Sequence, residues 1–360
     1  MKIRNDLLKE IYFFSIYVYI ISFYYLKIKG GDIFFKSGVI FSYICCVSLF
    51  FFIKHTKKEF FYLFFLIIVV LITLNTSLIP IILFSYFSKV IKDDKEFIKR
   101  YLIINLICYL GVIFLYSNNI YFLPQIDSFR IVGEEIKIRK SLGFSHPNAV
   151  FVYLIPIFLS YMYIRIEKWR LYDSLFIFGI SNVLYRLTNS RTGFILNSII
   201  IIYIHMWNLF EEYLEKIKLI KFFYLNLFTI MTTLSLSIGI FFHLNSKLNE
   251  LLSLRPMIWY EYSYNFISNI SILKRSKLKY LALDNSYLWI LFLDGVLIWI
   301  LYNYTYYKIL KNIFYKKEIK IIVIYLLLYS LFENIWTSIY INPFFVIGMI
   351  LIINKKESGE

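Results

Sequence analysis

Apolar segments long enough to form membrane helices recur along the whole of this 360-residue sequence. A helix needs about 20 mostly apolar residues to cross a bilayer. Apolar residues make up 60% of the chain and the mean hydropathy is +0.67, which is more apolar than a soluble domain of this size. The apolar segments are continuous rather than alternating, which favours helices over a membrane barrel. The sequence therefore predicts an all-α polytopic integral membrane protein, with residues 1–360 forming a single membrane domain.

About twelve transmembrane helices are expected. Their ranges are 10–26, 33–53, 60–74, 78–91, 101–117, 148–164, 173–188, 194–210, 222–242, 285–303, 321–339 and 343–353. The third and fourth could instead form one long helix or a re-entrant hairpin, but Asn75, Ser77 and Pro80 favour a break. Two connections, residues 117–147 and 243–284, are too long to be simple links between packed helices.

The net charge of +16 comes largely from lysines that lie between the apolar segments. If the N-terminus is cytoplasmic and the segments alternate, most lysines fall in cytoplasmic loops, as the positive-inside rule requires. Both termini are then cytoplasmic, and both long loops lie on the outer face. This distribution indicates a membrane protein rather than one that binds nucleic acid.

Several classes of chemistry have no signal in the sequence. Cys45, Cys46 and Cys108 all fall inside apolar segments and have neither disulfide nor metal-binding spacing. No residue spacing indicates a metal site. No P-loop or Rossmann glycine pattern is present, so the sequence does not predict a function driven by ATP.

Arginine is concentrated at the expected outer face, where the positive-inside rule does not predict it. The arginines concerned are Arg130, Arg139, Arg186, Arg191, Arg255 and Arg275. A guanidinium group binds phosphate with two parallel hydrogen bonds, so these residues indicate a phosphate or pyrophosphate ligand. Alternatively, they bind lipid headgroups or pair with the acidic residues Asp127, Glu134, Glu135 and Glu261. For Arg275, which lies in a basic run, a solvated or headgroup-binding surface is the better interpretation.

A short polar segment, residues 139–148, stands where an apolar segment begins. It contains Arg139, His146, Pro147 and Asn148. A histidine beside cations could bind substrate or transfer a proton. Equally, Pro147 and Asn148 are typical of a capped helix start, in which case these residues only shape the chain.

Four polar motifs together resemble a known family. They are the segment 139–148 with its Ser-Leu-Gly-Phe and His-Pro-Asn runs, the turn 190–193, the segment 254–259, and the segment 284–288, with Gly295 and Glu333 further along. In this order they resemble the Wzy-type polysaccharide polymerases of bacterial capsule and O-antigen synthesis, within the O-antigen polymerase and ligase superfamily. Related ligases often carry a histidine where this chain has Asp284, which favours a polymerase.

The resemblance implies a GT-C-like helical fold and a metal-independent glycosyltransferase without a cofactor. Such an enzyme polymerises undecaprenyl-pyrophosphate-linked oligosaccharide repeat units into capsular or O-antigen polysaccharide. It transfers the growing chain onto a new lipid-linked unit at the outer face of the bacterial cytoplasmic membrane. Its partners would be the lipid-linked oligosaccharide and membrane lipids, with a chain-length regulator and a flippase as candidate protein partners.

The residues expected to carry this chemistry fall into two groups. The candidate catalytic residues are Arg191, Arg255, His146, Asp284 and Glu333. The candidate residues for binding pyrophosphate or glycan are Arg139, Arg186, Arg130, Asn148, Asn285 and Tyr287. Simpler roles stay open, because Asp284 or Asn148 could cap a helix, and Glu333 could pair with an arginine or act as the base.

Two other functions compete with polymerisation. One is an O-antigen-ligase-like transfer of glycan to another acceptor. The other is a flippase or transporter for lipid-linked oligosaccharide. A transporter is expected to place polar residues along a central path at mid-membrane depth. The polar residues here gather at the outer ends of the expected helices, which favours surface chemistry.

Overall fold

The structure is a computed structural model that describes residues 2–26, 32–120, 128–132, 135–264, 270–273, 283–314 and 316–358. Helices account for nearly all the regular structure in these residues, as expected for an all-α membrane protein. The first half contains α1 (Lys2–Ile21), η1 (Ser22–Leu26), α2 (Asp32–Ser48), η2 (Leu49–Phe51), α3 (Lys57–Thr73), α4 (Leu78–Phe87), η3 (Ser88–Val90), α5 (Asp94–Ser117), α6 (Pro147–Val152), α7 (Ile155–Arg165) and η4 (Ile166–Lys168).

The second half continues the helical bundle. It contains α8 (Leu171–Thr188), α9 (Arg191–Lys216), α10 (Lys218–Phe242), α11 (Ser246–Leu251), α12 (Arg255–Tyr264), α14 (Ser286–Leu288), η5 (Trp289–Asp294), α15 (Val296–Ile313), α16 (Lys317–Ser330) and α17 (Phe344–Ser358). In the described residues the strands are β1 (Ser128–Val132) and β2 (Glu135–Arg139), which pair antiparallel with Ser128 opposite Arg139.

Within the described residues, six helical stretches are long and apolar enough to cross a membrane. They are Asn5–Tyr25, Ile33–Phe51, Asp94–Ser117, Pro147–Lys168, Arg191–Phe210 and Lys218–Phe242. The segments Leu78–Val90 and Phe344–Lys355 are apolar but shorter. Every one of the twelve expected segments overlaps helical residues. The structure therefore supports a membrane-embedded helical protein, while twelve crossings remain a proposal.

The predicted break between the third and fourth expected helices is confirmed. α3 ends at Thr73, and Leu74 adopts a left-handed conformation with φ of 51°. The Asn75 side-chain oxygen then accepts hydrogen bonds from the backbone N–H and the hydroxyl of Ser77. This turn chemistry competes with helix continuation and starts α4 at Leu78.

The expected helix 321–339 is wrong in its second half, because α16 ends at Ser330 and the chain continues without a regular helix to Pro343. Buried side chains donate hydrogen bonds to the backbone carbonyl groups there. The Tyr101 hydroxyl donates to the carbonyl oxygens of Ile339 and Tyr340, at 3.0 and 2.7 Å. Non-helical backbone is tolerated inside a membrane protein where other protein groups satisfy it. Glu333 consequently lies in a loop and not within a helix.

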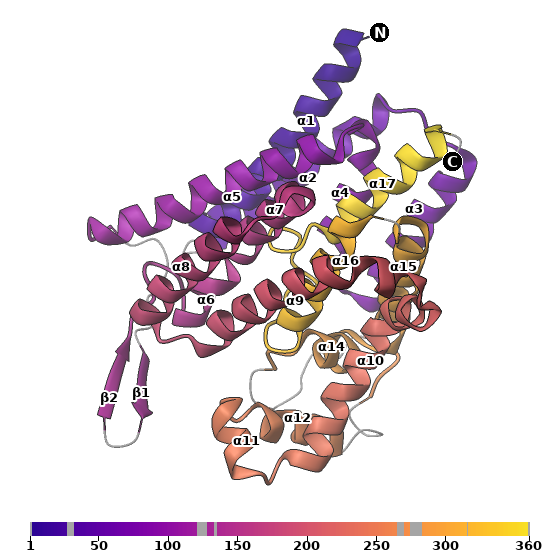
Figure 1. Ribbon diagram of the computed structural model, residues 1–360. Coiled ribbons are helices and arrows are strands. Elements are labelled where there is room, and N and C mark those ends of the chain that lie inside the picture. The colour runs from indigo at the N-terminus through magenta and orange to yellow at the C-terminus, as the bar shows by residue number, and fades with distance from the viewer. Residues whose placement is uncertain are drawn as a thin grey trace.

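Both long connections extend from the end of the molecule opposite the two chain termini (Figure 1). The first carries the β1–β2 hairpin, and the second carries α11 and α12. α12 packs on α10. The described parts of the two connections thus lie at one end of the bundle (Figure 1).

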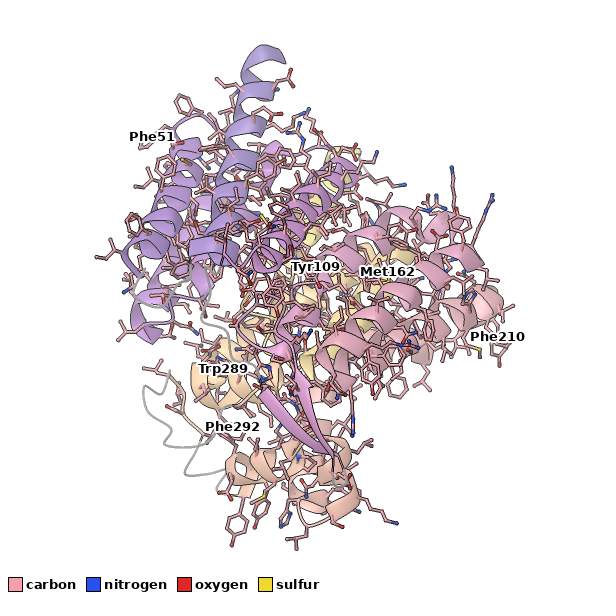
Figure 2. The ribbon with its side chains drawn as sticks, turned by 90° about the vertical axis from the view of Figure 1, so that its left-hand side faces the viewer. Phe51, Tyr109, Met162, Phe210, Trp289 and Phe292 are labelled. Carbon is pink, nitrogen blue, oxygen red and sulfur yellow. The ribbon has the colours of Figure 1, made fainter. Side chains whose placement is uncertain are left out.

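The core lies in the middle of the bundle and the outer helices expose apolar side chains. In Figure 2, Tyr109 and Met162 lie centrally, and Phe51 and Phe210 lie at the edges. Met162 is 1% exposed, whereas Phe51 is 81% exposed. An apolar outer surface of this kind suits contact with lipid rather than water.

Candidate functional site

Arg255, the first residue of α12, is buried beside two carboxylates. Its Nη2 atom lies 3.6 Å from Asp284 Oδ2 and 3.6 Å from Glu333 Oε1. Nη2 also donates to the carbonyl oxygen of Phe332 at 3.2 Å. Only 5% of Arg255 is exposed. We call Arg255, Asp284 and Glu333 the Arg255 cluster, and it joins residues from three distant parts of the chain.

The Arg255 cluster depends on a tight turn between α11 and α12. Ser253 and Leu254 both adopt positive φ angles, of 56° and 64°. The Leu254 N–H donates to the carbonyl oxygen of Asn249, and the Asn249 side-chain oxygen accepts from the N–H of Met257. These bonds satisfy backbone groups at the start of α12 and direct Arg255 inward.

Ser286 holds the Glu333 loop against the segment that carries Asp284. Its hydroxyl donates to the carbonyl oxygen of Glu333 at 2.7 Å and accepts from the N–H of Ile335 at 2.9 Å. Asp284 lies only two residues before Ser286. The two carboxylates are therefore positioned by one hydroxyl group as well as by Arg255.

The electrostatics of the Arg255 cluster favour retention of a proton. Burial, together with the neighbouring charge of Asp284, raises the pKa of Glu333 to about 8, against the opposing effect of Arg255. The Asp284 side chain is 48% exposed, and partial desolvation raises its pKa, again opposed by Arg255. Two carboxylates that share one guanidinium titrate as a pair. Near neutral pH such a pair can both accept and donate a proton.

A second group of polar residues surrounds Asn148. Arg139 Nη2 donates to Asn148 Oδ1 at 2.7 Å, and the Ser190 hydroxyl donates to the same oxygen at 3.1 Å. Arg139 Nε also donates to the carbonyl oxygen of Thr188. We call Arg139, His146, Asn148 and Ser190 the Asn148 cluster. It connects the end of β2 to the polar turn between α8 and α9.

The predicted capped helix start at residues 146–148 is confirmed, with His146 as the capping residue. Its Nδ1 accepts a hydrogen bond from the N–H of Asn148 at 3.1 Å, and Pro147 occupies the first helical position of α6. Asn148 itself is not the cap, which leaves its side chain to bind Arg139 and Ser190. Nδ1 acts as the acceptor in this bond, so the ring is in the state that carries its proton on Nε2.

Gly143 shapes the turn that precedes His146. It has φ of +91°, and a Cβ atom there would lie 3.0 Å from the carbonyl oxygen of Val112. Leu142, its neighbour, also has a positive φ, of 50°. The glycine is needed both for its conformation and for this close approach to α5.

The two clusters lie close enough to interact. Burial lowers the pKa of His146, and the positive charges of Arg139 and Arg255 lower it further. Tyr329 provides a structural link, because its hydroxyl donates to the carbonyl oxygen of Gly193 near the start of α9. The Tyr329 carbonyl accepts from the N–H of Glu333. The start of α9 is thereby held near the Arg255 cluster.

The remaining predicted arginines occupy different places. Arg191 begins α9 directly after Ser190, is half-buried, and has no ion pair within the described residues. Arg186 is exposed in the last turn of α8. Arg130 lies on β1 opposite Lys137, with its side chain outside the described part of the structure. Arg275 also lies outside the described residues.

Asn285 and Tyr287 are fully buried and bonded within the protein. Asn285 Oδ1 accepts from the N–H groups of Tyr287 and Leu288 and so caps α14, a role that Asp284 does not take. The Tyr287 hydroxyl donates to the carbonyl oxygen of Leu327. In this structure both residues support the segment that carries Asp284.

Sequence reasoning missed Ser286 and Tyr329. Ser286 stands inside the motif 284–288, but its two backbone partners are 47 and 49 residues away in the chain. Tyr329 is one of 33 tyrosines, and no local pattern separates it from the others. Neither role has a signal in the sequence.

Comparison of the chain with protein-family models, with curated proteins and with solved structures found no match. Within the described residues, no group of three or more His, Cys, Asp or Glu side chains is arranged to hold a metal ion. The geometry of the two clusters and the sequence motifs are therefore what indicates a function.

Proposed function

We propose that this protein polymerises undecaprenyl-pyrophosphate-linked oligosaccharide units by glycosyl transfer. The observation that carries the proposal is the Arg255 cluster, a buried guanidinium between two carboxylates, with His146 close enough to feel the charges of both Arg255 and Arg139. Cations and a proton-holding carboxylate pair are the groups that transfer from a glycosyl pyrophosphate requires.

The arginines divide into two roles. The charge of Arg255 is offset by Asp284, and Glu333 lies at the same distance from it, so the main task of Arg255 is to hold the two carboxyl groups in position. Arg191 and Arg139, at the start of α9 and the end of β2, are the cations proposed to bind the pyrophosphate. A guanidinium aimed at developing charge is worth far more in a water-poor site than in bulk water.

The proposed reaction is a single displacement at the anomeric carbon of the growing glycan. A hydroxyl group at the non-reducing end of the new lipid-linked unit attacks that carbon and forms the glycosidic bond. The bond from the anomeric carbon to the pyrophosphate oxygen breaks, and its electron pair leaves with undecaprenyl pyrophosphate. The hydroxyl proton passes to the Asp284–Glu333 pair. The glycosyl-pyrophosphate bond supplies the energy, so no nucleotide enters the reaction.

The setting of this reaction is proposed to be the outer face of the bacterial cytoplasmic membrane. Twelve crossings, a GT-C-like arrangement and cytoplasmic termini belong to the same proposal. It is supported by the position of both long loops at the end of the bundle opposite the termini (Figure 1). Lipid-anchored donor and acceptor would both reach the two clusters from the outer leaflet.

The decisive experiment supplies purified protein with synthetic undecaprenyl-pyrophosphate repeat units. We expect longer products without added nucleotide, and the same products when EDTA is present. Arg191→Ala should abolish long products while the protein still inserts and purifies normally. Arg170→Ala, at the opposite end of α8, is the matched control and should polymerise normally.

Two results would replace the proposal by an alternative. Transfer of glycan only to a different acceptor, with no lengthening of the lipid-linked chain, would indicate a ligase. Movement of lipid-linked oligosaccharide across vesicles without bond formation would indicate a flippase. Normal chain length in Arg191→Ala would refute the role of that arginine in binding pyrophosphate.

A further inference from the structure

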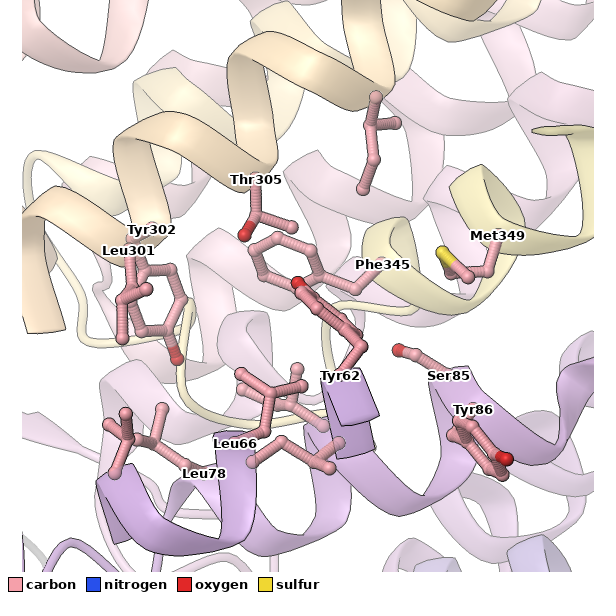
Figure 3. Close-up of a pocket in the computed structure, with 14 residues that line it drawn as sticks. Tyr62, Leu66, Leu78, Ser85, Tyr86, Leu301, Tyr302, Thr305, Phe345 and Met349 are labelled. Atoms are coloured by element: carbon pink, nitrogen blue, oxygen red, sulfur yellow. The ribbon is translucent and has the colours of Figure 1, made fainter. Parts of the chain in front are cut away.

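A largely apolar cavity lies between α3, α4, α15 and α17, away from both polar clusters. It holds about 120 Å³ and is lined along α4 from Leu78 to Tyr86 and along α15 from Leu301 to Ile309. Figure 3 shows Tyr62 from α3 and Phe345 from α17 extending into it. Eight residues of helix rise by about 12 Å, so the lining runs along the helices for that distance.

The position of α3 places this cavity at the edge of the bundle. Phe60, Phe61 and Phe64 on α3 are 54%, 71% and 54% exposed, as expected for a helix that faces lipid. Tyr62, which lines the cavity, is itself 43% exposed. The cavity therefore lies next to the apolar outer surface, and its long direction follows the helices.

Next to the cavity is a basic hollow of about 370 Å³, lined by the start of α1 and by the segments that follow η2 and η3. Asn354 of α17 donates to the carbonyl oxygen of Lys92, so the hollow lies at the end of the bundle that carries the chain termini. Its charged lining residues are Lys9, Lys54, Lys89, Lys92, Asp6, Asp93 and Glu96.

Most of the charges in the hollow are already engaged. Lys9 pairs with Glu96 at 3.2 Å, and Asp93 accepts the N–H of Lys95 at the start of α5. Lys54 and Lys92 have no carboxylate partner among the described residues. With four lysines against three carboxylates in its lining, the hollow keeps one net positive charge, and Lys54 and Lys92 are the lysines available to a ligand.

A single layer of side chains separates the apolar cavity from the basic hollow. Tyr86 lines the cavity, and Lys89, which lines the hollow, places its Nζ 4.6 Å from the centre of the Tyr86 ring. The same Nζ lies 3.2 Å from His55 Nδ1 and 3.3 Å from Glu59 Oε2. Lys89 is thus held in place as part of the wall between the two spaces.

The Ser85 hydroxyl, in the cavity wall next to Tyr86, is buried and has no hydrogen-bond partner among the residues that the structure describes. In a phospholipid the ester carbonyl groups lie between the charged headgroup and the apolar chains. A carbonyl acceptor at this position would satisfy the donor that the protein leaves unpaired. From the basic hollow inward, a ligand would therefore meet first the lysines, then the Ser85 hydroxyl and then the apolar lining of the cavity.

We infer that this region binds one anionic phospholipid, with its phosphate group at Lys54 and Lys92 and one acyl chain in the apolar cavity. Charge complementarity commits the site to an anionic lipid, because a zwitterionic headgroup would bring a cation to the same lysines. The site is distinct from the proposed glycan site and does not depend on it.

The test is native mass spectrometry of the full-length protein in detergent, titrated with phosphatidylglycerol or with phosphatidylcholine. Wild-type protein should bind phosphatidylglycerol more tightly. In the double variant Lys54→Gln and Lys92→Gln, binding should weaken about thirtyfold, since each lysine near an anionic group contributes about fivefold. The matched control is Lys58→Gln with Lys99→Gln, two exposed lysines outside the hollow, and should bind as the wild type does.

A second variant separates the cavity from the hollow. Leu66→Trp should fill the cavity and weaken binding of phosphatidylglycerol, and soluble glycerol phosphate should bind neither protein measurably. Equal affinity for the two lipids would overturn the inference. So would an unchanged affinity in the double lysine variant, an equal loss in its control, or tight binding of glycerol phosphate.

Discussion

Replacing Glu333 by Gln should remove much of the pH dependence of this protein's stability. The pKa of Glu333 is raised from an ordinary value of 4.5 to about 8 in the folded protein. A carboxyl group whose pKa is raised by folding contributes stability below its unfolded pKa and loses it as pH rises through the folded pKa. At 1.36 kcal/mol per pH unit, the interval from 4.5 to about 8 corresponds to about 5 kcal/mol in total.

Between pH 6 and pH 9 the same relation predicts that wild-type protein loses roughly 3 kcal/mol of unfolding free energy through Glu333. This is an upper limit, because 18% of the side chain is exposed. The Gln side chain resembles the protonated carboxyl group. The unfolding free energy of Glu333→Gln should therefore change less with pH over this range, and the variant should be more stable than wild type at pH 9.

The assay is equilibrium unfolding of detergent-solubilised protein at pH 6, 7, 8 and 9, followed by tryptophan fluorescence. Glu250→Gln is the matched control, since Glu250 is an exposed carboxylate on α11. Its pH profile should parallel that of the wild type. Parallel profiles for Glu333→Gln and wild type would refute the reasoning that burial near Asp284 holds a proton on Glu333.

Two further changes test the construction of the site. Gly143→Ala should destabilise the protein by about 1 to 3 kcal/mol because φ is +91° and the Val112 carbonyl oxygen is close. Thermal unfolding should show this loss. Gly179→Ala is the control and should not lower stability, because an added Cβ atom there meets nothing within 4 Å. Ser286→Ala should cost about 1 to 3 kcal/mol and reduce polymerisation, because it releases two backbone groups of the Glu333 loop. Wild-type polymerisation in that variant would contradict a positioning role for Ser286.

Much of the local structure is predictable because it depends on neighbouring residues. Continuous apolar segments predict helices, and the turn at Asn75–Ser77 and the capped start at Pro147 follow from short-range hydrogen bonding. Gly143 is recognisable as a turn residue for the same reason. The early end of α16 is not predictable, because its loop is held by Tyr101 and Ser286 from other helices.

The sequence by itself determined the class of protein, the approximate helix ranges and the presence of two long polar loops. Hydropathy and charge patterns depend only on the order of residues, so the sequence alone is enough to read them. Only the tertiary structure brought Arg255, Asp284 and Glu333 together and gave Asn148 two donors from different elements. Those contacts join residues 9 to 78 positions apart. Sequence can identify the candidate residues, but packing decides which of them share a proton or a ligand.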